Sequence, residues 1–381
     1  MEHFMGRINA KRWSVFILTF LCILLAFLLL SSSQAVGNGV REGVKLCADV
    51  VIPSLFPFMV LSGFMATSKV SLLLNKIFMP VTKYLFRLPA AAASPLLMGW
   101  IGGYPVGART LALMVGQQRI SEKTASRMLC FCVNAGPSFL ICAVGAGMFG
   151  STQVGLLLLG AQVVSSIVIG VILGLFSQKE SPLQNGSPYG YRPNSVCFVQ
   201  SVNDASAGMM TICAFVVLFS AITSLILSTG VVTSLASSLK SVFPSLNSGL
   251  FEACLFSVLE VVAGCKKLAA YGFGGLLAAA ALLSFSGLSV IFQVLAAVHG
   301  SGINTKPFLI SRVLHGGLTL TFFCVLLRIF PQAITVFENL SQPVAATEGS
   351  AGGSICLLAM CAVFLLTTGG RNQVNEPRIK S

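Results

Sequence analysis

The stretch GWIGGYPVGAR, residues 99–109, decides how this chain can fold, because it places four glycines and one proline inside an apolar segment. Proline lacks a backbone N–H and glycine tolerates a tight reversal, so a straight helix is disfavoured here. A helix that breaks inside a membrane exposes amide and carbonyl groups that lipid cannot satisfy. We therefore interpret residues 90–117 as a broken helical hairpin. The competing interpretation is a kinked helix whose glycines allow close packing.

The rest of the chain has the composition of a membrane protein. Of its 381 residues, 55% are hydrophobic and only 9% are charged, and the mean hydropathy is +0.88. Soluble domains carry about a quarter charged residues. The net charge of +13 could suggest nucleic acid, but most Lys and Arg lie in short segments between apolar runs, as positive-inside topology requires. We therefore expect the lipid bilayer, and no nucleic acid, as the partner.

The N-terminal residues 1–12 are basic and precede an apolar run over residues 13–30. This run is long for the core of a secretory signal and is followed by a mediocre cleavage site, so an uncleaved span is favoured over a signal sequence. With the N-terminus in the cytoplasm, a second span returns over residues 45–66. Residues 68–89 then suit an amphipathic helix on the cytoplasmic face.

The two halves of the chain follow one plan. After the first hairpin come spans over residues 128–148 and 153–176, and then a polar linker rich in Ser, Pro, Gly and Asn. The second half is predicted to begin with a span over residues 205–227, an outer amphipathic stretch to residue 248 and a broken segment over residues 249–270. A span over residues 272–298, a cytoplasmic loop with Lys306 and Arg312 and a span to residue 327 follow. An outer loop over residues 330–354 and a last span then precede a basic tail.

This plan divides the chain into five parts. They are an N-terminal span (1–40), a first repeat (41–176), a cytoplasmic linker (177–201), a second repeat (202–330) and a C-terminal part (331–381).

Weak internal similarity relates the halves. Residues 57–62 resemble residues 214–220, and NAGPS, residues 134–138, resembles SFSGL, residues 284–288. Three crossings separate the first pair, so the repeats are expected to be inverted. We predict an all-α polytopic membrane protein with about eight transmembrane helices, two re-entrant or broken hairpins and both termini in the cytoplasm. Such interrupted inverted repeats are typical of secondary transporters, whose sites lie where the helices break.

Polar residues at these breaks form the candidate site, because such groups are costly at that depth and are functional hypotheses by default. Glu260 is the strongest candidate and could bind a solute hydroxyl or amine, or a coupling ion, H+ or Na+. The alternative is an internal pair with Lys266 or Lys267 that only stabilises the hairpin. The candidate substrate-binding residues are Gly103, Tyr104, Pro105, Gly107, Asn134, Gly136, Pro137, Ser138, Glu260, Gly264, Ser284, Ser286 and Gly287.

Other function classes have no support in the sequence. The patterns Gly-x-Ser-x-Gly, Walker and His-Glu-x-x-His are absent, so no enzymatic activity is expected. The tight cysteine pair Cys130-x-Cys132 has neither a second pair nor histidine partners. We therefore expect no metal site, no disulfide framework and no cofactor.

Four motifs in order resemble a known family: CADVVIPSLFPF (residues 47–58), GGYPVGA (102–108), NAGPS (134–138) and EVVAGC (260–265). Together they resemble the sporulation integral membrane protein YlbJ family over roughly residues 44–327. That resemblance implies paired nucleoside-recognition, or Gate, domains, related to the core of concentrative nucleoside transporters and to the gate regions of ferrous iron transporters. It also implies a solute site surrounded by the broken segments.

Two functional hypotheses follow. In the first, the protein is transporter-like and moves or senses a small polar solute needed for spore envelope or cortex formation, in the plasma membrane or a membrane that surrounds the forespore. In the second, it is a non-transporting morphogenetic scaffold, which recruits sporulation membrane proteins through its linker and basic loops.

Overall fold

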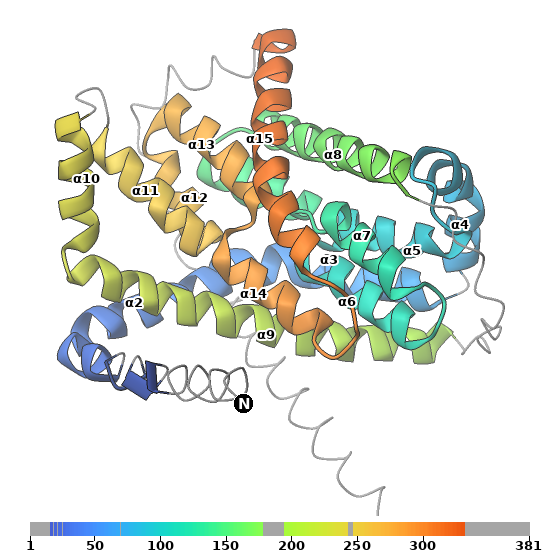
Figure 1. Ribbon diagram of the computed structural model, residues 1–381, viewed down its shortest axis with the longest axis horizontal. Coiled ribbons are helices and arrows are strands. Elements are labelled where there is room, and N and C mark those ends of the chain that lie inside the picture. The colour runs from blue at the N-terminus through green and yellow to red at the C-terminus, as the bar shows by residue number, and fades with distance from the viewer. Residues whose placement is uncertain are drawn as a thin grey trace, which may run out of the picture.

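The computed structural model describes residues 16–331 except 18, 21, 25, 69, 178–193 and 243–246 (Figure 1). Every regular element in these residues is a helix. The first half contains α2 (Ser33–Leu46), the π-helical turn η1 (Cys47–Val51), α3 (Ile52–Thr67), α4 (Val70–Pro80), η2 (Val81–Leu85), η3 (Ala90–Ala92), α5 (Ala93–Gly102), α6 (Tyr104–Gly116), α7 (Glu122–Cys132), η4 (Phe139–Met148) and α8 (Thr152–Leu175). The second half contains α9 (Asn194–Ser228), α10 (Val231–Val242), α11 (Ser248–Leu259), α12 (Val261–Ala269), α13 (Gly272–Phe285), α14 (Gly287–Val298) and α15 (Lys306–Ile329).

The same order of elements occurs in both halves. Each half has a long helical segment (α2 to α3, α9), a short helix (α4, α10), a packed helix pair (α5 and α6, α11 and α12), an interrupted helix (α7 and η4, α13 and α14) and a closing long helix (α8, α15). The short helices α4 and α10 lie at opposite ends of the molecule, and the two packed pairs approach its centre from opposite sides (Figure 1). Equivalent elements of the two halves thus lie on opposite sides of the molecule (Figure 1).

The halves are interleaved rather than separate. Helix α9 packs along α2 and α3, and α15 packs against α7 and α8. Helix α6 of the first half packs on α14, and α12 of the second half packs on η4. Each hairpin thus rests on the interrupted helix of the other half.

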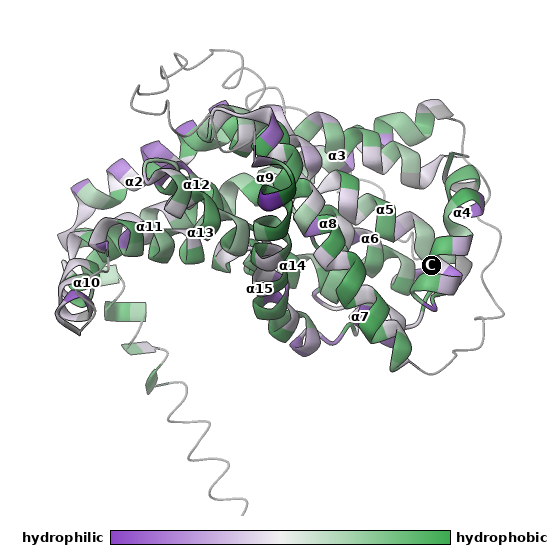
Figure 2. Ribbon diagram, turned by 90° about the horizontal axis from the view of Figure 1, so that it is seen from above, coloured by the Kyte–Doolittle hydropathy of each residue, from purple (hydrophilic) through white to green (hydrophobic). Residues whose placement is uncertain are grey.

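The chain has the surface and helix lengths of an integral membrane protein. Five helical segments in the described residues are long and apolar enough to cross a membrane, namely Ser33–Met65, Thr152–Leu175, Ser195–Ser228, Gly272–Val298 and Lys306–Ile329. Hydrophobic residues lie along most helices (Figure 2). On α15, Ile310 and Val313 are 75% and 68% exposed, which suits contact with lipid. The prediction of an all-α polytopic membrane protein is confirmed.

Several predicted boundaries differ from the structure. The span predicted over residues 128–148 is divided, because residues 133–136 have no helical structure. Helix α9 begins at Asn194, inside the predicted linker, and residues 178–193 lie outside the described part. Arg312 was predicted in a loop but is buried within α15. The predicted first span is described only in part, and residues 332–381, with the last span, lie outside the described residues.

The interruption between α5 and α6 depends on glycine. Gly103 has φ 87° and ψ −176°, a backbone conformation that is essentially restricted to glycine. Gly99 and Gly107 serve a second purpose, because a Cβ atom on them would lie 1.9 Å and 2.6 Å from the carbonyl oxygen of Cys132. Close packing of the hairpin on the end of α7 therefore accounts for these two glycines, while Gly103 makes the break.

Candidate functional site

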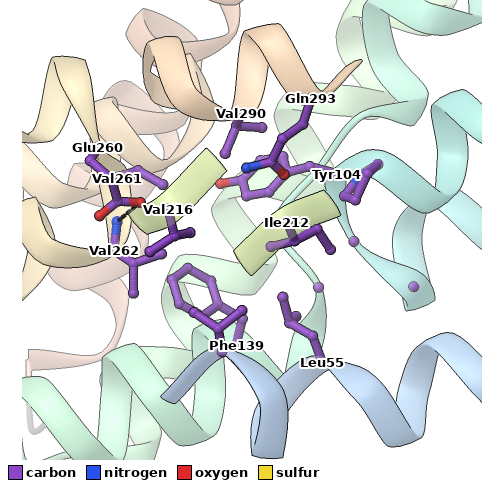
Figure 3. Close-up of a pocket in the computed structure, with 15 residues that line it drawn as sticks. Leu55, Tyr104, Phe139, Ile212, Val216, Glu260, Val261, Val262, Val290 and Gln293 are labelled. Atoms are coloured by element: carbon purple, nitrogen blue, oxygen red, sulfur yellow. Dashed lines mark hydrogen bonds between the residues drawn. The ribbon is translucent and has the colours of Figure 1, made fainter. Parts of the chain in front are cut away.

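The two hairpin tips and the two interrupted helices meet at one cavity (Figure 3). The empty space among its side chains, its mouth included, measures about 480 Å³. Its lining consists of Val51, Leu55, Gly102, Gly103, Tyr104, Pro105, Gly136, Phe139, Ile212, Val216, Glu260, Val261, Val262, Val290 and Gln293. The walls are mostly apolar and carry few polar groups, a composition typical of small-molecule sites.

Glu260 forms the tip of the second hairpin. It lies between α11 and α12 in extended conformation, with φ −137° and ψ 110°, and its side chain is 1% exposed. Its Oε1 accepts a hydrogen bond from the Val262 N–H at 3.2 Å, and its Oε2 accepts one from the Ala263 N–H at 2.5 Å. The carboxylate therefore caps the N-terminus of α12, where the helix dipole favours negative charge.

The predicted alternative, an ion pair of Glu260 with Lys266 or Lys267, is not present. The Nζ atom of Lys267 lies over the Phe256 ring, 3.7 Å from its centroid, and Lys266 is exposed. Within the described ranges, no cationic side chain is placed beside the Glu260 carboxylate. Each carboxylate oxygen accepts one backbone hydrogen bond, so each retains capacity for a further donor.

The tip of the first hairpin contains no charge. Gly103 occupies the N-cap position of α6, and no side chain there accepts a hydrogen bond from the helix. The next residue, Tyr104, is buried, and its hydroxyl donates to the Leu283 carbonyl oxygen at 2.5 Å. Tyr104 and Gln293 lie at the opposite end of the cavity from Glu260 (Figure 3). The cavity thus has a carboxylate at one end and a hydroxyl and an amide at the other.

A cluster of buried polar side chains lies behind Tyr104, and sequence reasoning missed most of it. Arg312 is fully buried in α15, and Gln162 of α8 is 1% exposed. The Gln162 side-chain amide is buried without a hydrogen-bond partner among the described residues, and His315 Nε2 contacts the backbone carbonyl oxygen of Gln162 at 3.3 Å. The signal was present in the 3-to-4-residue spacing of Arg312, His315 and Thr319, which marks one polar stripe on an apolar helix.

The predicted site residues divide into two groups. Those that line the cavity are Gly103, Tyr104, Pro105, Gly136 and Glu260. The others lie at or beside the breaks but outside the lining: Gly107, Asn134, Pro137, Ser138, Gly264, Ser284, Ser286 and Gly287. A role of either group in binding stays a prediction.

The residues outside the lining have structural contacts. Gly264, one of the candidate residues of the second broken segment, lies within α12, where a Cβ would be 2.2 Å from Ser257 Oγ. Asn134 Nδ2 donates to the Phe131 carbonyl oxygen at 2.9 Å, and the Ser138 hydroxyl donates to the Ser54 carbonyl oxygen. These contacts stabilise the breaks from behind.

The break between α13 and α14 is made by two residues with positive φ. Ser286 has φ 83° and Gly287 has φ 65°. A Cβ on Gly287 would lie 3.0 Å from the Ser257 carbonyl oxygen, and the Ser286 hydroxyl donates to the Ser284 carbonyl oxygen at 3.4 Å. The interruption therefore faces the end of α11, just before Glu260.

His, Cys, Asp and Glu side chains are the potential metal ligands of the described ranges. No group of three or more His, Cys, Asp or Glu side chains there is arranged to hold a metal ion. The cysteines of the same part of the chain are free thiols. The polar side chains in the lining of the cavity are Glu260, Tyr104 and Gln293.

Comparison with known proteins assigns part of this architecture. Residues 48–152 match the family model described as nucleoside recognition, or Gate. Over this range the chain is similar to Gate proteins. The matched range includes the first hairpin and the first interrupted helix, which contribute Gly103, Tyr104 and Gly136 to the cavity. The second half lies outside the matched range.

Similarity to a curated relative extends beyond residues 48–152. The chain is 24% identical over 398 residues to the sporulation integral membrane protein YlbJ of Bacillus subtilis (strain 168). The aligned region covers 93% of this chain and 96% of the relative. The resemblance predicted from the four motifs is thereby confirmed. No solved structure matches.

Proposed function

We propose that this membrane protein binds a small polar solute in the cavity between its hairpin tips and moves or senses that solute during sporulation. One observation carries the proposal: two hairpin tips and two interrupted helices, from both halves of the chain, converge on a cavity that contains the buried Glu260. Helix breaks at a shared cavity are the usual construction of transporter sites. An unpaired intramembrane carboxylate supports the same conclusion.

The chemistry of the cavity defines the class of solute. Glu260 offers acceptor capacity, so it suits a hydroxyl or amine on the solute. Phe139, Ile212 and Val216 form apolar walls, which suit a flat or apolar face of the same molecule. A proton or Na+ on Glu260 would neutralise the buried carboxylate and couple to solute movement.

The packing of the halves suggests how access would change. Each hairpin packs on the interrupted helix of the other half, so a rigid movement of one half against the other would alter both ends of the cavity. In this proposal residues 41–176 and 202–330 are two inverted Gate-type repeats. The chain crosses the plasma membrane, or a membrane around the forespore, several times, with both termini in the cytoplasm.

A scaffold function is the second candidate, and one observation favours it. The relative is named for sporulation and membrane integration alone, without a solute. In this alternative the hairpins are structural, and the polar linker and basic loops recruit other sporulation membrane proteins. No enzymatic step belongs to either candidate.

Uptake and binding by proteoliposomes distinguish these candidates. We would present nucleosides, peptidoglycan precursors and metal ions to the wild-type protein, Glu260→Gln and the matched control Glu252→Gln, which changes a partly exposed residue on the same hairpin. A solute that binds wild type and Glu252→Gln but not Glu260→Gln supports transport. If no solute binds and Glu260→Gln still supports sporulation, the scaffold candidate replaces the transport candidate.

A further inference from the structure

Arg312 carries a buried positive charge without a carboxylate partner. Its side chain is fully buried in the middle of the protein, and the groups that face it are the Phe308 ring, His315, Tyr104, Cys130 and Cys132. Across the described ranges, none of its hydrogen-bond acceptors is acidic. A guanidinium in an apolar interior is costly unless strong acceptors surround it, so this residue requires a specific explanation.

The acceptors of Arg312 are carbonyl groups at the C-terminal ends of two interrupted helices. Its Nη2 donates to the Cys130 carbonyl oxygen at 2.5 Å, and its Nη1 donates to the Val133 carbonyl oxygen at 2.7 Å. Nη1 also reaches the Ser284 carbonyl oxygen of α13 at 3.5 Å. Carbonyl groups at helix C-termini lack intrahelical partners and carry partial negative charge. Two helix ends thus take the place of a carboxylate.

Other side chains bond only one of these two helix ends. The hydroxyl of Ser166 donates to the Phe131 carbonyl oxygen near the end of α7, and the Tyr104 hydroxyl donates to the Leu283 carbonyl oxygen near the end of α13. Among the side-chain hydrogen bonds of the described residues, those of Arg312 alone join the two ends. The planar guanidinium fork suits this geometry, whereas a lysine ammonium is a single point of charge.

The two helix ends control the walls of the cavity. Gly136 and Phe139 follow the end of α7, and Val290 and Gln293 follow the end of α13. Tyr104 lines the cavity and bonds the residue next to Ser284. A change in the separation of the two ends would therefore shift both walls, although Arg312 itself does not line the cavity.

We propose that Arg312 is a positioning residue that fixes the C-terminal ends of α7 and α13 to each other and thereby sets the shape of the cavity. We call this connection between the two helix ends through Arg312 the clamp. The clamp is a property of the fold, and its effect on solute affinity rests on the proposed function. Arg312→Lys, which keeps the charge and loses the fork, is the appropriate variant. It is also less disruptive than a neutral replacement.

Hydrogen–deuterium exchange of the full-length protein in lipid nanodiscs tests the clamp without any solute. In Arg312→Lys we expect exchange about tenfold faster in peptides over both breaks, residues 130–138 and 283–289, as the loss of one charge-assisted hydrogen bond implies. Ser166→Ala should affect only the first region and Tyr104→Phe only the second. Arg328→Lys, an exposed site on the same helix, should affect neither.

A second measurement keeps the test decisive if peptide coverage is incomplete. Cys132 is fully buried at the end of α7, so its labelling by N-ethylmaleimide, followed by mass spectrometry, should be faster in Arg312→Lys than in Arg328→Lys. Wild-type exchange at both breaks in Arg312→Lys, or faster exchange spread evenly over α8 and α9 as well, would overturn the clamp. A failure to find any solute would count against the proposed function and leave this result unaffected.

Discussion

The two hairpin tips occupy matching places in the two halves, yet one is a bare glycine and the other a buried carboxylate. Gly103 turns the chain between α5 and α6 with a positive φ and no capping side chain. Glu260 turns it between α11 and α12 with an ordinary extended backbone and caps α12. The first hairpin shows that such a tip closes without a charge. The cost of burying Glu260 is therefore not a requirement of hairpin geometry, which favours a function for its carboxylate.

The difference also assigns separate tasks to the two tips. At Gly103 the backbone conformation is the constraint, and almost any side chain would be strained. At Glu260 the backbone tolerates any residue except proline, and the side chain is the special feature. Substitutions at the first tip should act on folding, whereas substitutions at the second should act on ligand binding.

The largest effect is expected when the charged tip loses its charge. Glu260→Gln keeps the size of the side chain but removes a charged acceptor, so the dissociation constant for a bound solute should rise about 10- to 150-fold, the equivalent of about 1.5–3 kcal/mol. Scintillation proximity or calorimetric binding in detergent would measure it, with Glu252→Gln as control. Equal affinity in Glu260→Gln and wild type would contradict the functional difference between the tips.

For the stability of the fold, substitution of Gly103 should have a larger effect than substitution of Glu260. Gly103→Ala places a Cβ in a backbone region that only glycine occupies readily, so it should destabilise the fold by about 1–3 kcal/mol. Glu260→Ala loses a helix cap, worth about 1 kcal/mol, but also removes the cost of a buried charge. Thermal unfolding followed by size-exclusion chromatography would compare the two. A lower melting temperature for Glu260→Ala than for Gly103→Ala would contradict the assignment.

The sequence predicts the breaks well because their causes are local. Glycine and proline at residues 102–105 act through their own backbone, and a lone glutamate in an apolar run is conspicuous from composition alone. The second break was predicted only to within residues 249–270, and its candidate Gly264 serves close packing of α12 on α11 rather than a turn. Glycine has both uses, and only the neighbouring helix decides between them.

The polar cluster behind the cavity was harder to predict because its cause is not local. Arg312 follows Lys306 closely, so the positive-inside rule places both in one loop. The residue is buried only because the ends of α7 and α13, far apart in sequence, both direct carbonyl groups at it. Single-sequence reasoning cannot supply such long-range acceptors.

A smaller effect would sharpen the comparison at the uncharged tip. Tyr104→Phe removes the hydroxyl that bonds the Leu283 carbonyl oxygen while keeping the ring in the cavity wall. It should cost about 1 kcal/mol of stability and change solute affinity less than Glu260→Gln does. Thermal unfolding and the binding assay above would be applied to the same samples. A loss of affinity as large as that of Glu260→Gln would give both tips direct roles in binding.

The orientation of the hairpins in the membrane can be tested by labelling, with substitutions that are expected to leave stability and solute affinity unchanged. If the halves are inverted, the base of the first hairpin near Gln118 and the base of the second near Ala270 face opposite sides of the membrane; both residues are exposed. Single cysteines, Gln118→Cys and Ala270→Cys, in a background without other reactive thiols should react with a membrane-impermeant maleimide from opposite sides. Labelling of both from one side would refute the inverted repeat. The two tips would then enter the cavity from one face, and their difference could not serve alternating access.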